Sequence, residues 1–340
     1  MKILYFPISG RKGASSRYRV YQYIPFLEEA GFEVKIQLPG VRAKRGIRRL
    51  VNSFLERAAV LRAAREADIL YIQKRLFDGG LIKRMLQLRK RVVFDFDDSI
   101  FTSPKSDWSH LTKPRVHRRI KEIFKGADLV LSGNEYLKTF ALEWGATNVT
   151  VLPTALDTSR YPLKTCRGGE ASILGWIGSS VNYRYLNMLS SVIPLLSSEF
   201  KGLRLLVVSD GTYGMHGAQV ENRPWSEETE VRDIHDMDVG LMPLEDNEWT
   251  RGKCALKALQ YMASGIPAVC SPVGANLDVV ESGRQGLLAG SDDEWVASIR
   301  CLLGSSALRK RMGIAGRERV ESGYDLRTLA AMKIRLLRSL

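Results

Sequence analysis

Residues 251–270 read RGKCALKALQYMASGIPAVC. The spacing of the apolar residues predicts a helix over Cys254–Ser264, and the short apolar run that follows predicts a strand over Ala268–Cys270. Short apolar segments and longer amphipathic segments alternate in this way along the whole chain. This alternation is typical of βαβ units, so we expect an α/β protein with parallel sheets.

The expected strands fall into two groups. The first group is predicted at Ile3–Phe6, Val34–Leu38, Ile69–Ile72, Val92–Asp95, Leu129–Ser132 and Val149–Leu152. The second group is predicted at Ile173–Ile177, Leu203–Val208, Val239–Met242, Ala268–Cys270 and Gly286–Ala289. Further helices are predicted at Ser16–Ala30, Tyr185–Phe200, Asp292–Leu303, Leu308–Ser322 and from Leu326 onward. Pro25 either kinks the first of these helices or marks its start.

Residues 161–169 combine proline, glycine and mixed polar residues without periodicity, which predicts a domain boundary. We therefore expect one α/β domain over residues 1–165, a second one over 170–322, and a basic C-terminal helix over 323–340. Two successive doubly wound sheets place a cleft between the domains, where strand ends and helix N-termini meet and ligands bind.

The composition excludes several classes of protein. The 340 residues are 45% hydrophobic and 26% charged, which excludes a disordered or low-complexity chain. No window approaches the roughly 18 apolar residues of a membrane-spanning helix, and the N-terminus lacks the features of a signal peptide, so we expect a cytoplasmic protein. The cysteines form no CxxC pair and the histidines show no ligand spacing, so we expect no metal site.

Loops at three of the predicted strand ends combine small residues with cations. Neither GxGxxG nor GxxxxGK[ST] occurs, which disfavours dinucleotide dehydrogenases and P-loop NTPases. The first loop, residues 10–19, carries Gly13, Arg17 and Arg19 before a helix, and its backbone N–H groups and arginines suit an anion. The alternative is a solvated basic loop with a serine N-cap.

The second loop, residues 175–184, contains Gly178 and Ser179, with Arg184 one turn further on. The third contains Lys253 and Lys257, which the predicted helix places on one face of its first turns. Two such lysines repel each other unless a polyanion binds between them. Together with Arg184 they predict a pyrophosphate cradle that needs no metal; the alternative is a solvated helix face.

Residues 252–276 resemble the donor-binding segment of the family 4 glycosyltransferases, also called group 1, which have the GT-B fold. The likeness continues through residues 278–288 and 308–319, and residues 132–134 and 152–157 are similar to the ends of that family's N-terminal domain. It implies two Rossmann-like domains whose parallel sheets face each other across a cleft, with a final helix that crosses back to the first domain. It also implies a nucleotide-diphosphate sugar bound mainly by the second domain and an acceptor bound by the first.

The resemblance assigns donor-binding roles by position. Arg184 takes the place of the lysine that contacts the donor phosphates, and Ser179 takes that of an arginine. The family's two glutamates fall on Gly252 and Gln260, so both carboxylates are missing, and Gln260 would contact the ribose as a neutral amide. The two lysines of the third loop would then supply the missing phosphate contacts. The predicted donor set is Gly178, Ser179, Arg184, Lys253, Lys257, Gln260, Gly274 and Asn276.

Three aspartates, Asp95, Asp97 and Asp98, lie at the end of the fourth predicted strand. Many relatives have a histidine here, near the reacting sugar, and Asp97 occupies that position. We expect Asp97 to hydrogen-bond donor or acceptor hydroxyls, and we place Asp95 with Gly13, Arg17 and Arg19 in the acceptor or phosphate loop. The alternatives are helix capping by Asp98 or Ser99 and a divalent cation bound in a DxD manner, against which the GT-B resemblance argues.

The predicted chemistry follows from charge. Cleavage of the sugar–phosphate bond leaves negative charge on the diphosphate, which Lys257 and Arg184 would stabilise, and Asp97 completes the predicted catalytic set. The resemblance implies retention of anomeric configuration and no required metal or other cofactor. The predicted function is that of a glycosyltransferase of the hexosyltransferase class, acting on a glycan or lipid-linked acceptor in the synthesis of cell-surface polysaccharide or glycoconjugate.

The net charge of +14, from 51 Lys and Arg against 37 Asp and Glu, indicates anionic partners. Basic residues gather in residues 41–68, interspersed with apolar ones, and again in residues 115–121. Both stretches suit peripheral association with the anionic inner face of the cell membrane; a solvated face that attracts the anionic donor is the alternative. The rival functions are a nucleotide-sugar epimerase of the same fold and a basic nucleic-acid- or membrane-binding protein without transferase activity. No nucleic-acid-binding signature occurs, so we expect no nucleic-acid partner.

Overall fold

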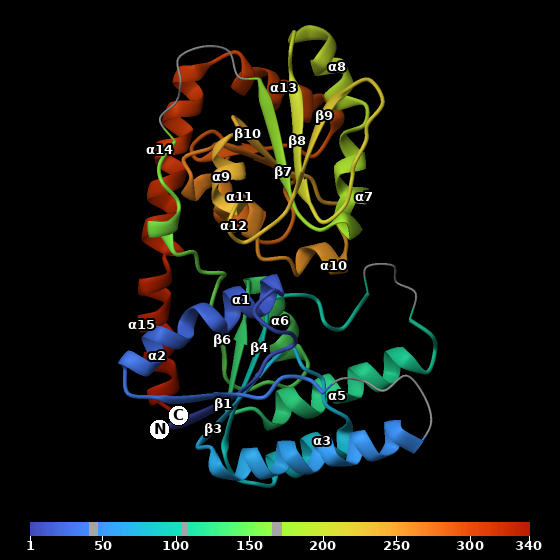
Figure 1. The fold of residues 1–340 in the computed structure, drawn as a ribbon, viewed down its shortest axis with the longest axis vertical. Coiled ribbons are helices and arrows are strands. Elements are labelled where there is room, and N and C mark those ends of the chain that lie inside the picture. The colour runs from blue at the N-terminus through green and yellow to red at the C-terminus, as the bar shows by residue number, and fades with distance from the viewer. Residues whose placement is uncertain (41–46, 104–107, 165–171) are drawn as a thin grey trace. The chain divides into compact units, whose positions relative to one another are not determined.

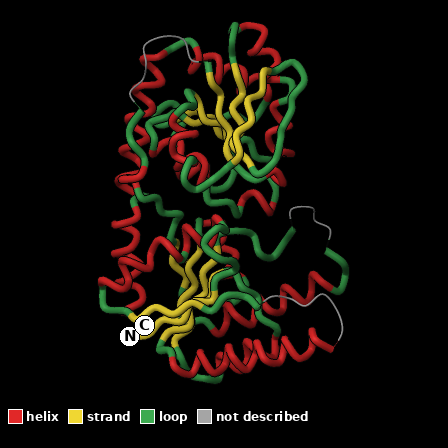
Figure 2. The backbone as a smooth tube through the Cα atoms, viewed as in Figure 1, coloured by secondary structure: helices red, strands yellow, loops and turns green. Residues whose placement is uncertain are grey.

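Two compact units form the chain in the computed structural model, which describes residues 1–40, 47–103, 108–164 and 172–340, without the side chains of residues 47–53. Unit 1 comprises Met1–Ala155, Gly252–Cys254 and Leu326–Leu340. Unit 2 comprises Leu156–Arg251 and Ala255–Asp325. The boundary predicted at residues 161–169 lies partly outside the described residues, and unit 2 begins before it. Each unit has one sheet with flanking helices (Figures 1 and 2).

Unit 1 is built on a parallel sheet with the strand order β2-β1-β3-β4-β5-β6. Its strands are β1 (Lys2–Phe6), β2 (Glu33–Ile36), β3 (Ile69–Gln73), β4 (Arg91–Phe96), β5 (Leu129–Ser132) and β6 (Val149–Val151). Its α-helices are α1 (Ala14–Arg19), α2 (Ile24–Glu29), α3 (Ile47–Glu66), α4 (Gly79–Leu86), α5 (Thr112–Gly126), α6 (Glu135–Glu143) and α15 (Leu326–Arg338). Leu4 and Phe6 pack in the core on one face of the sheet and Ile3 and Tyr5 in the core on the other, because successive strand residues point to opposite faces.

Unit 2 repeats this plan with the parallel strand order β12-β11-β10-β7-β8-β9. Its strands are β7 (Ile173–Ile177), β8 (Arg204–Ser209), β9 (Gln219–Pro224), β10 (Val239–Met242), β11 (Ala268–Cys270) and β12 (Gly286–Leu288). Its α-helices are α7 (Tyr183–Leu186), α8 (Val192–Glu199), α9 (Glu230–His235), α10 (Glu248–Arg251), α11 (Leu256–Ala263), α12 (Asn276–Val279), α13 (Asp292–Leu303) and α14 (Ser306–Gly323). The prediction of an α/β chain with two parallel sheets is confirmed.

In each sheet the strand order reverses beside the first strand: successive strands are added first on one side of it and then on the other. In unit 1, β1 connects to β2 on one side while β3 connects to β4 on the other; in unit 2, β7 connects to β8 and β10 to β11 in the same way. The loops that leave the two strands therefore diverge, and α/β proteins bind ligands at such points, at the carboxyl ends of the strands. The residues that follow β1, β3, β7 and β10 are thus the first candidates for a site.

Three of the predicted helices differ from the structure. The helix expected over Tyr185–Phe200 is divided into α7, a short 3-10 turn over Asn187–Leu189, and α8. The helix expected over Ser16–Ala30 is divided into α1, a short 3-10 turn and α2, and Pro25 lies in the first turn of α2, where its missing N–H costs nothing. The helix expected over Cys254–Ser264 begins only at Leu256, because Ala255 has a left-handed backbone with φ of 53°. Lys253 precedes the helix, so the prediction that it shares a helix face with Lys257 is wrong.

The C-terminal helix α15 packs on the sheet of unit 1, where Leu329, Ala330 and Leu337 join the same core as Ile3 and Tyr5. Unit 1 therefore contains both ends of the chain.

Lys333 of α15 is fully buried in this core. Its Nζ lies 4.1 Å from the centroid of the Tyr23 ring and 4.4 Å from that of Tyr71, and it donates a hydrogen bond of 2.8 Å to the carbonyl oxygen of Arg19. Burial lowers the pKa of Lys333 to about 7; Asp95 opposes this shift and Arg19 adds to it.

This shift predicts a pH dependence of stability. An unfolded lysine has a pKa of about 10.4. Between about pH 7 and pH 10 the folded protein therefore binds fewer protons than the unfolded one, and the free energy of unfolding should rise with pH. In a Lys333→Met variant this rise should be absent. Urea unfolding at several pH values tests it, and an unchanged slope in the variant would assign the dependence to another group.

Candidate functional site

Lys257 lies at the start of α11, beside the end of β7 in unit 2. Its Nζ is 4.6 Å from the centroid of the Trp176 ring, and a methyl group at Gly178 would come within 2.8 Å of its Cε. Gly178 thus leaves the space that the lysine side chain occupies. The cation lies at the point where the sheet of unit 2 reverses, at a helix N-terminus whose N–H groups carry partial positive charge. This arrangement suits a phosphate or diphosphate.

The loop after β7 is held by Asp210. The Ser179 hydroxyl donates to its Oδ2 (3.2 Å) and the Ser180 backbone N–H to its Oδ1 (2.6 Å). The backbone hydrogen bond from Ser180 is the main cause that lowers the pKa of Asp210. The side-chain hydrogen bonds from Ser180 and Ser179 lower it further. Arg184 lies on α7 and is exposed, and its guanidinium is 4.6 Å from the centroid of the Tyr185 ring. The predicted Ser179 and Arg184 therefore both lie at the surface of unit 2.

The other predicted donor residues of unit 2 are enclosed in its loops and helices. Gln260 is 3% exposed and its Nε2 donates to the Tyr161 hydroxyl (3.3 Å). Asn276 is 1% exposed and its Nδ2 donates to a backbone carbonyl of the preceding loop (2.9 Å). Gly274 has φ of 54°, and a methyl group there would lie 2.6 Å from the carbonyl oxygen of Arg251. These contacts favour a role in shaping loops, and the contact of Gln260 with a ribose stays a prediction.

Lys253 belongs to unit 1, unlike the rest of the predicted donor set. Its carbonyl oxygen accepts a hydrogen bond of 3.1 Å from Asn134 Nδ2, after β5, and the Sγ of Cys254 donates to the carbonyl oxygen of Asp97, after β4, over 3.3 Å. The structure therefore groups Lys253 with the carboxyl ends of the unit 1 strands.

Asp97 is the centre of a polar cluster where β1, β3 and β4 end. The Ser15 hydroxyl lies 2.7 and 2.9 Å from its two carboxylate oxygens, and Lys74 Nζ lies 3.2 Å from Oδ1 and also pairs with Asp98. Burial by itself would raise the pKa of Asp97, but Lys74, Arg19 and the Ser15 hydroxyl together hold it below its usual value. The cluster thus presents a charged hydrogen-bond acceptor at the point where the unit 1 sheet reverses.

Arg19 and Asp95 form an ion pair inside unit 1. Arg19 Nη2 lies 2.6 Å from Asp95 Oδ1, and both side chains are 0% exposed. The Tyr71 hydroxyl also donates to Asp95, and Arg19 donates to the carbonyl oxygens of Leu152 and Pro153. Neither side chain has a surface on which a ligand could lie, which favours a structural role over the predicted place in an acceptor loop.

The loop after β1 makes a tight turn. The Gly13 N–H donates to the carbonyl oxygen of Gly10 (3.0 Å), and a methyl group at Gly13 would lie 2.0 Å from Ser9 Oγ. Gly13 itself is the N-cap of α1, so the alternative of a serine N-cap is wrong. Arg17 is 6% exposed, with its guanidinium 4.8 Å from the Tyr18 ring centroid, so a phosphate contact by Arg17 would need this packing to open.

The alternatives for the three aspartates can be compared with the structure. No helix begins in residues 97–103, so helix capping by Asp98 or Ser99 is wrong. Within the described ranges, no group of three His, Cys, Asp or Glu side chains gathers in a way that could hold a metal ion. Asp95 and Asp97 instead have cationic partners, Arg19 and Lys74.

Residues 171–305 match the family described as "Glycosyl transferases group 1". The resemblance to group 1 glycosyltransferases is confirmed. The glycogen synthase of Mycobacterium tuberculosis (strain CDC 1551 / Oshkosh) is 24% identical over 201 residues, which are 55% of this chain and 47% of that protein. The chain thus spans about half the length of this curated relative.

Solved glycosyltransferases share the whole fold. A sucrose-phosphate synthase from Thermosynechococcus elongatus superposes with a TM-score of 0.78 at 14% identity, covering 100% of this chain and 98% of that one. Anabaena Alr3699/HepE, solved with UDP-glucose, gives a TM-score of 0.69 at 15% identity over 100% of both chains. At these identities the likeness shows the fold alone, and the predicted GT-B fold is confirmed.

The match to the group 1 glycosyltransferases includes Gly178, Arg184 and Lys257, whereas Asp97 lies outside the matched residues. The sequence analysis missed Lys74, Ser15 and Gln73. Lys74 follows the predicted strand Ile69–Ile72 by two residues, so the rule that functional groups gather at strand carboxyl ends could have found it.

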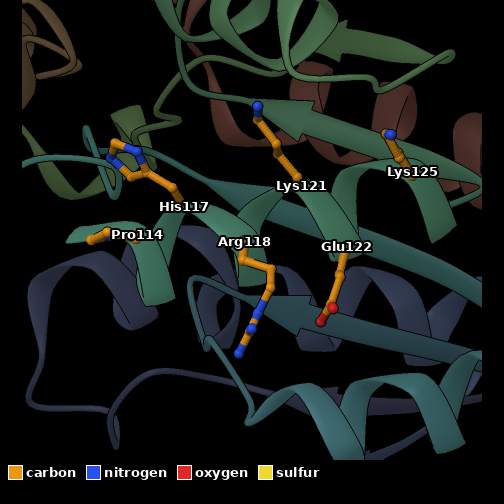
Figure 3. Close-up of a pocket in the computed structure, with 6 residues that line it drawn as sticks. All are labelled: Pro114, His117, Arg118, Lys121, Glu122 and Lys125. Atoms are coloured by element: carbon orange, nitrogen blue, oxygen red, sulfur yellow. The ribbon is translucent and has the colours of Figure 1, made fainter. Parts of the chain in front are cut away.

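A hollow of about 420 Å³ lies along α5, and none of the predicted catalytic, donor-binding or phosphate-loop residues lines it. Its lining residues are Pro114, His117, Arg118, Lys121, Glu122 and Lys125. In Figure 3, Lys121 and Lys125 point to one side of the helix and Arg118 and Glu122 to the other. The helix carries six Lys and Arg residues and one Glu, so this part of unit 1 is strongly basic.

Proposed function

We propose that the protein is a glycosyltransferase that transfers a sugar from a nucleotide-diphosphate sugar to a hydroxyl group of a glycan or lipid-linked acceptor. The observation that carries this proposal is the placement of Lys257 across Gly178 and Trp176, at the N-terminus of α11 and at the reversal point of the unit 2 sheet. The family match over residues 171–305 supports it, as do the UDP and UDP-glucose complexes of HepE.

The chain's own residues suggest how the reaction would proceed. As the sugar–phosphate bond breaks, negative charge builds on the leaving diphosphate, and Lys257, Arg184 and the α11 N–H groups would stabilise it without a metal. The ionised Asp97 would accept a hydrogen bond from a sugar hydroxyl. Retention of configuration, with the acceptor's proton passing to a phosphate oxygen of the donor, is the stereochemical outcome that we propose.

Donor binding and turnover test the proposal in one series of measurements. A nucleoside diphosphate at 100 times its dissociation constant should stabilise the protein by about 2.7 kcal/mol. We expect a thermal shift with UDP or GDP that EDTA leaves unchanged, and consumption of the matching nucleotide sugar only with an acceptor present. Conversion of the donor sugar without an acceptor would favour an epimerase. No thermal shift together with salt-sensitive binding of RNA or DNA would favour the nucleic-acid alternative.

We further propose that α3 and α5 attach unit 1 to an anionic membrane, where a lipid-linked acceptor would lie. Phe54 and Leu55 of α3 are 73% and 59% exposed, and Leu111 beside α5 is 76% exposed, next to the exposed cations of α5. Exposed apolar side chains among cations are the features of an interfacial helix. No helix of the described residues is long and apolar enough to span a bilayer. Residues 41–46 of the predicted basic stretch lie outside the description.

Vesicle binding tests this attachment. Each cation near an anionic surface contributes about 1 kcal/mol, so the double variant Arg115→Gln/Arg118→Gln should bind phosphatidylglycerol vesicles about thirtyfold more weakly in co-sedimentation. The matched control is Lys310→Gln/Arg311→Gln, which removes two exposed cations from α14 of unit 2. Equal weakening in both variants would mean that only the net charge matters and that α5 is no docking face.

A further inference from the structure

Lys74 has a backbone conformation that the surrounding structure must impose. It follows β3 with φ of 56°, a left-handed conformation that lysine rarely adopts, and its N–H donates a hydrogen bond of 2.9 Å to the carbonyl oxygen of Asp95. The turn directs the side chain across the end of β4, where it pairs with Asp97 and Asp98. Strained backbone of this kind is concentrated at functional sites.

The orientation of Asp97 is fixed from two sides. Lys74 and Asp97 are 13% and 12% exposed, so their ion pair is largely shielded from water. On the other side, Ser15 donates to the carboxylate and in turn accepts from Gln73 Nε2 (2.7 Å). Gln73 Oε1 accepts from the Ile8 N–H and the Ser16 hydroxyl, both over 3.0 Å. The loops after β1, β3 and β4 are thus joined in one hydrogen-bonded network.

We infer that Lys74 is a positioning residue of this site. It orients Asp97 and keeps it a carboxylate, so that Asp97 accepts a hydrogen bond from a sugar hydroxyl and cannot donate one. This inference rests on the proposed glycosyltransferase function. With Lys74 present, the group formed with Asp97 and Asp98 carries a net charge of −1, which suits a hydrogen-bond donor such as a sugar hydroxyl.

Without Lys74, two neighbouring carboxylates would lose their shared cation. Burial raises the pKa of Asp97 and the charge of Lys74 opposes that effect, so the pKa of Asp97 should rise when Lys74 is removed. The other groups around Asp97 are Arg19, which favours its charged form, and the thiol of Cys254, which faces its backbone carbonyl. Arg19 is shared with Asp95 over 2.6 Å and cannot replace Lys74.

The test compares Lys74→Met with the conservative Lys74→Arg and with Lys83→Met, whose lysine forms an exposed ion pair with Glu122 on the same unit. We expect Lys74→Met to lower kcat roughly tenfold to a hundredfold with little change in KM for the nucleotide sugar. The acid limb of the pH profile of kcat should lie about one pH unit higher in Lys74→Met than in the parent. Lys74→Arg should recover most of the activity, and Lys83→Met should resemble the parent. In an Asp97→Asn background, Lys74→Met should have little further effect on kcat.

A second measurement separates this inference from the proposed function. Carbon NMR of labelled aspartate follows the titration of Asp97 directly, with Asp97→Asn to assign its signal, and needs no turnover. A raised titration in Lys74→Met or, if that variant unfolds, in Lys74→Gln supports the role of Lys74 even if no sugar transfer is found, in which case the transferase proposal alone fails. An unchanged titration, or a loss of kcat that simply adds to that of Asp97→Asn, overturns the inference.

Discussion

An Arg19→Met variant is expected to lose about 3 to 5 kcal/mol of unfolding free energy, because it leaves the carboxylate of Asp95 buried without its cation. The ion pair is 2.6 Å long and both side chains are fully buried, so water cannot replace the guanidinium. Urea unfolding at neutral pH, followed by hydrogen exchange of the amides in β4, measures the effect on unit 1 separately from unit 2.

Two further variants identify the cause of this loss. Arg91→Met removes an exposed pair of 3.4 Å to Asp128 in the same unit and should cost less than about 1 kcal/mol. The double variant Arg19→Met/Asp95→Leu should recover much of the stability lost in Arg19→Met, because the buried carboxylate that lost its cation is then also removed. A loss as small as that of Arg91→Met would show that Asp95 finds another partner, for which Lys333, whose pKa Asp95 influences, is the candidate.

Lys257→Ala is expected to lower kcat/KM by roughly a hundredfold to a thousandfold, which is the effect of removing one donor that stabilises charge in a transition state. The affinity for the nucleoside diphosphate should fall with it, since the same ammonium would contact the bound phosphates. Initial rates with the nucleotide sugar identified by thermal shift, and calorimetric titration with the corresponding diphosphate, measure the two effects.

The matched control for Lys257→Ala is Lys310→Ala, which removes an exposed lysine from α14 of the same unit and should leave both quantities unchanged. If Lys257→Ala kept full activity and affinity, the diphosphate would have to bind elsewhere, and Arg184 would be the next candidate. A Lys257→Ala protein that binds normally but turns over slowly would confine the lysine's role to the transition state.

Periodicity was sufficient to predict the strands with strongly apolar sequences. Leu129–Ser132, Ile173–Ile177, Val239–Met242 and Ala268–Cys270 are strands over the predicted residues, because buried parallel strands are continuous apolar runs. The strand β9 was missed, since its sequence QVENRP has no such run and it lies at the edge of the sheet, where polar side chains face water.

The site was harder to predict because its residues come from separate strands. Lys257 and Gly178 could be singled out from local composition, but their contact depends on the packing of α11 beside β7. Because Ala255 has a left-handed backbone, α11 begins after Lys253, and no pattern in the sequence predicts this turn. Arg19 and Asp95 look like ligand-binding residues in a loop and at a strand end, yet they bind each other in the core.

The position of α15 in unit 1 also determines which unit can fold first during synthesis. Unit 2 is complete in sequence at Asp325, whereas the core of unit 1 lacks Leu329, Leu337 and Lys333 until α15 leaves the ribosome. Domains fold as units while the chain is made, so the unit that is translated second should reach its native core first. A chain released before α15 would carry a folded unit 2 and a unit 1 whose aromatic core is open to water.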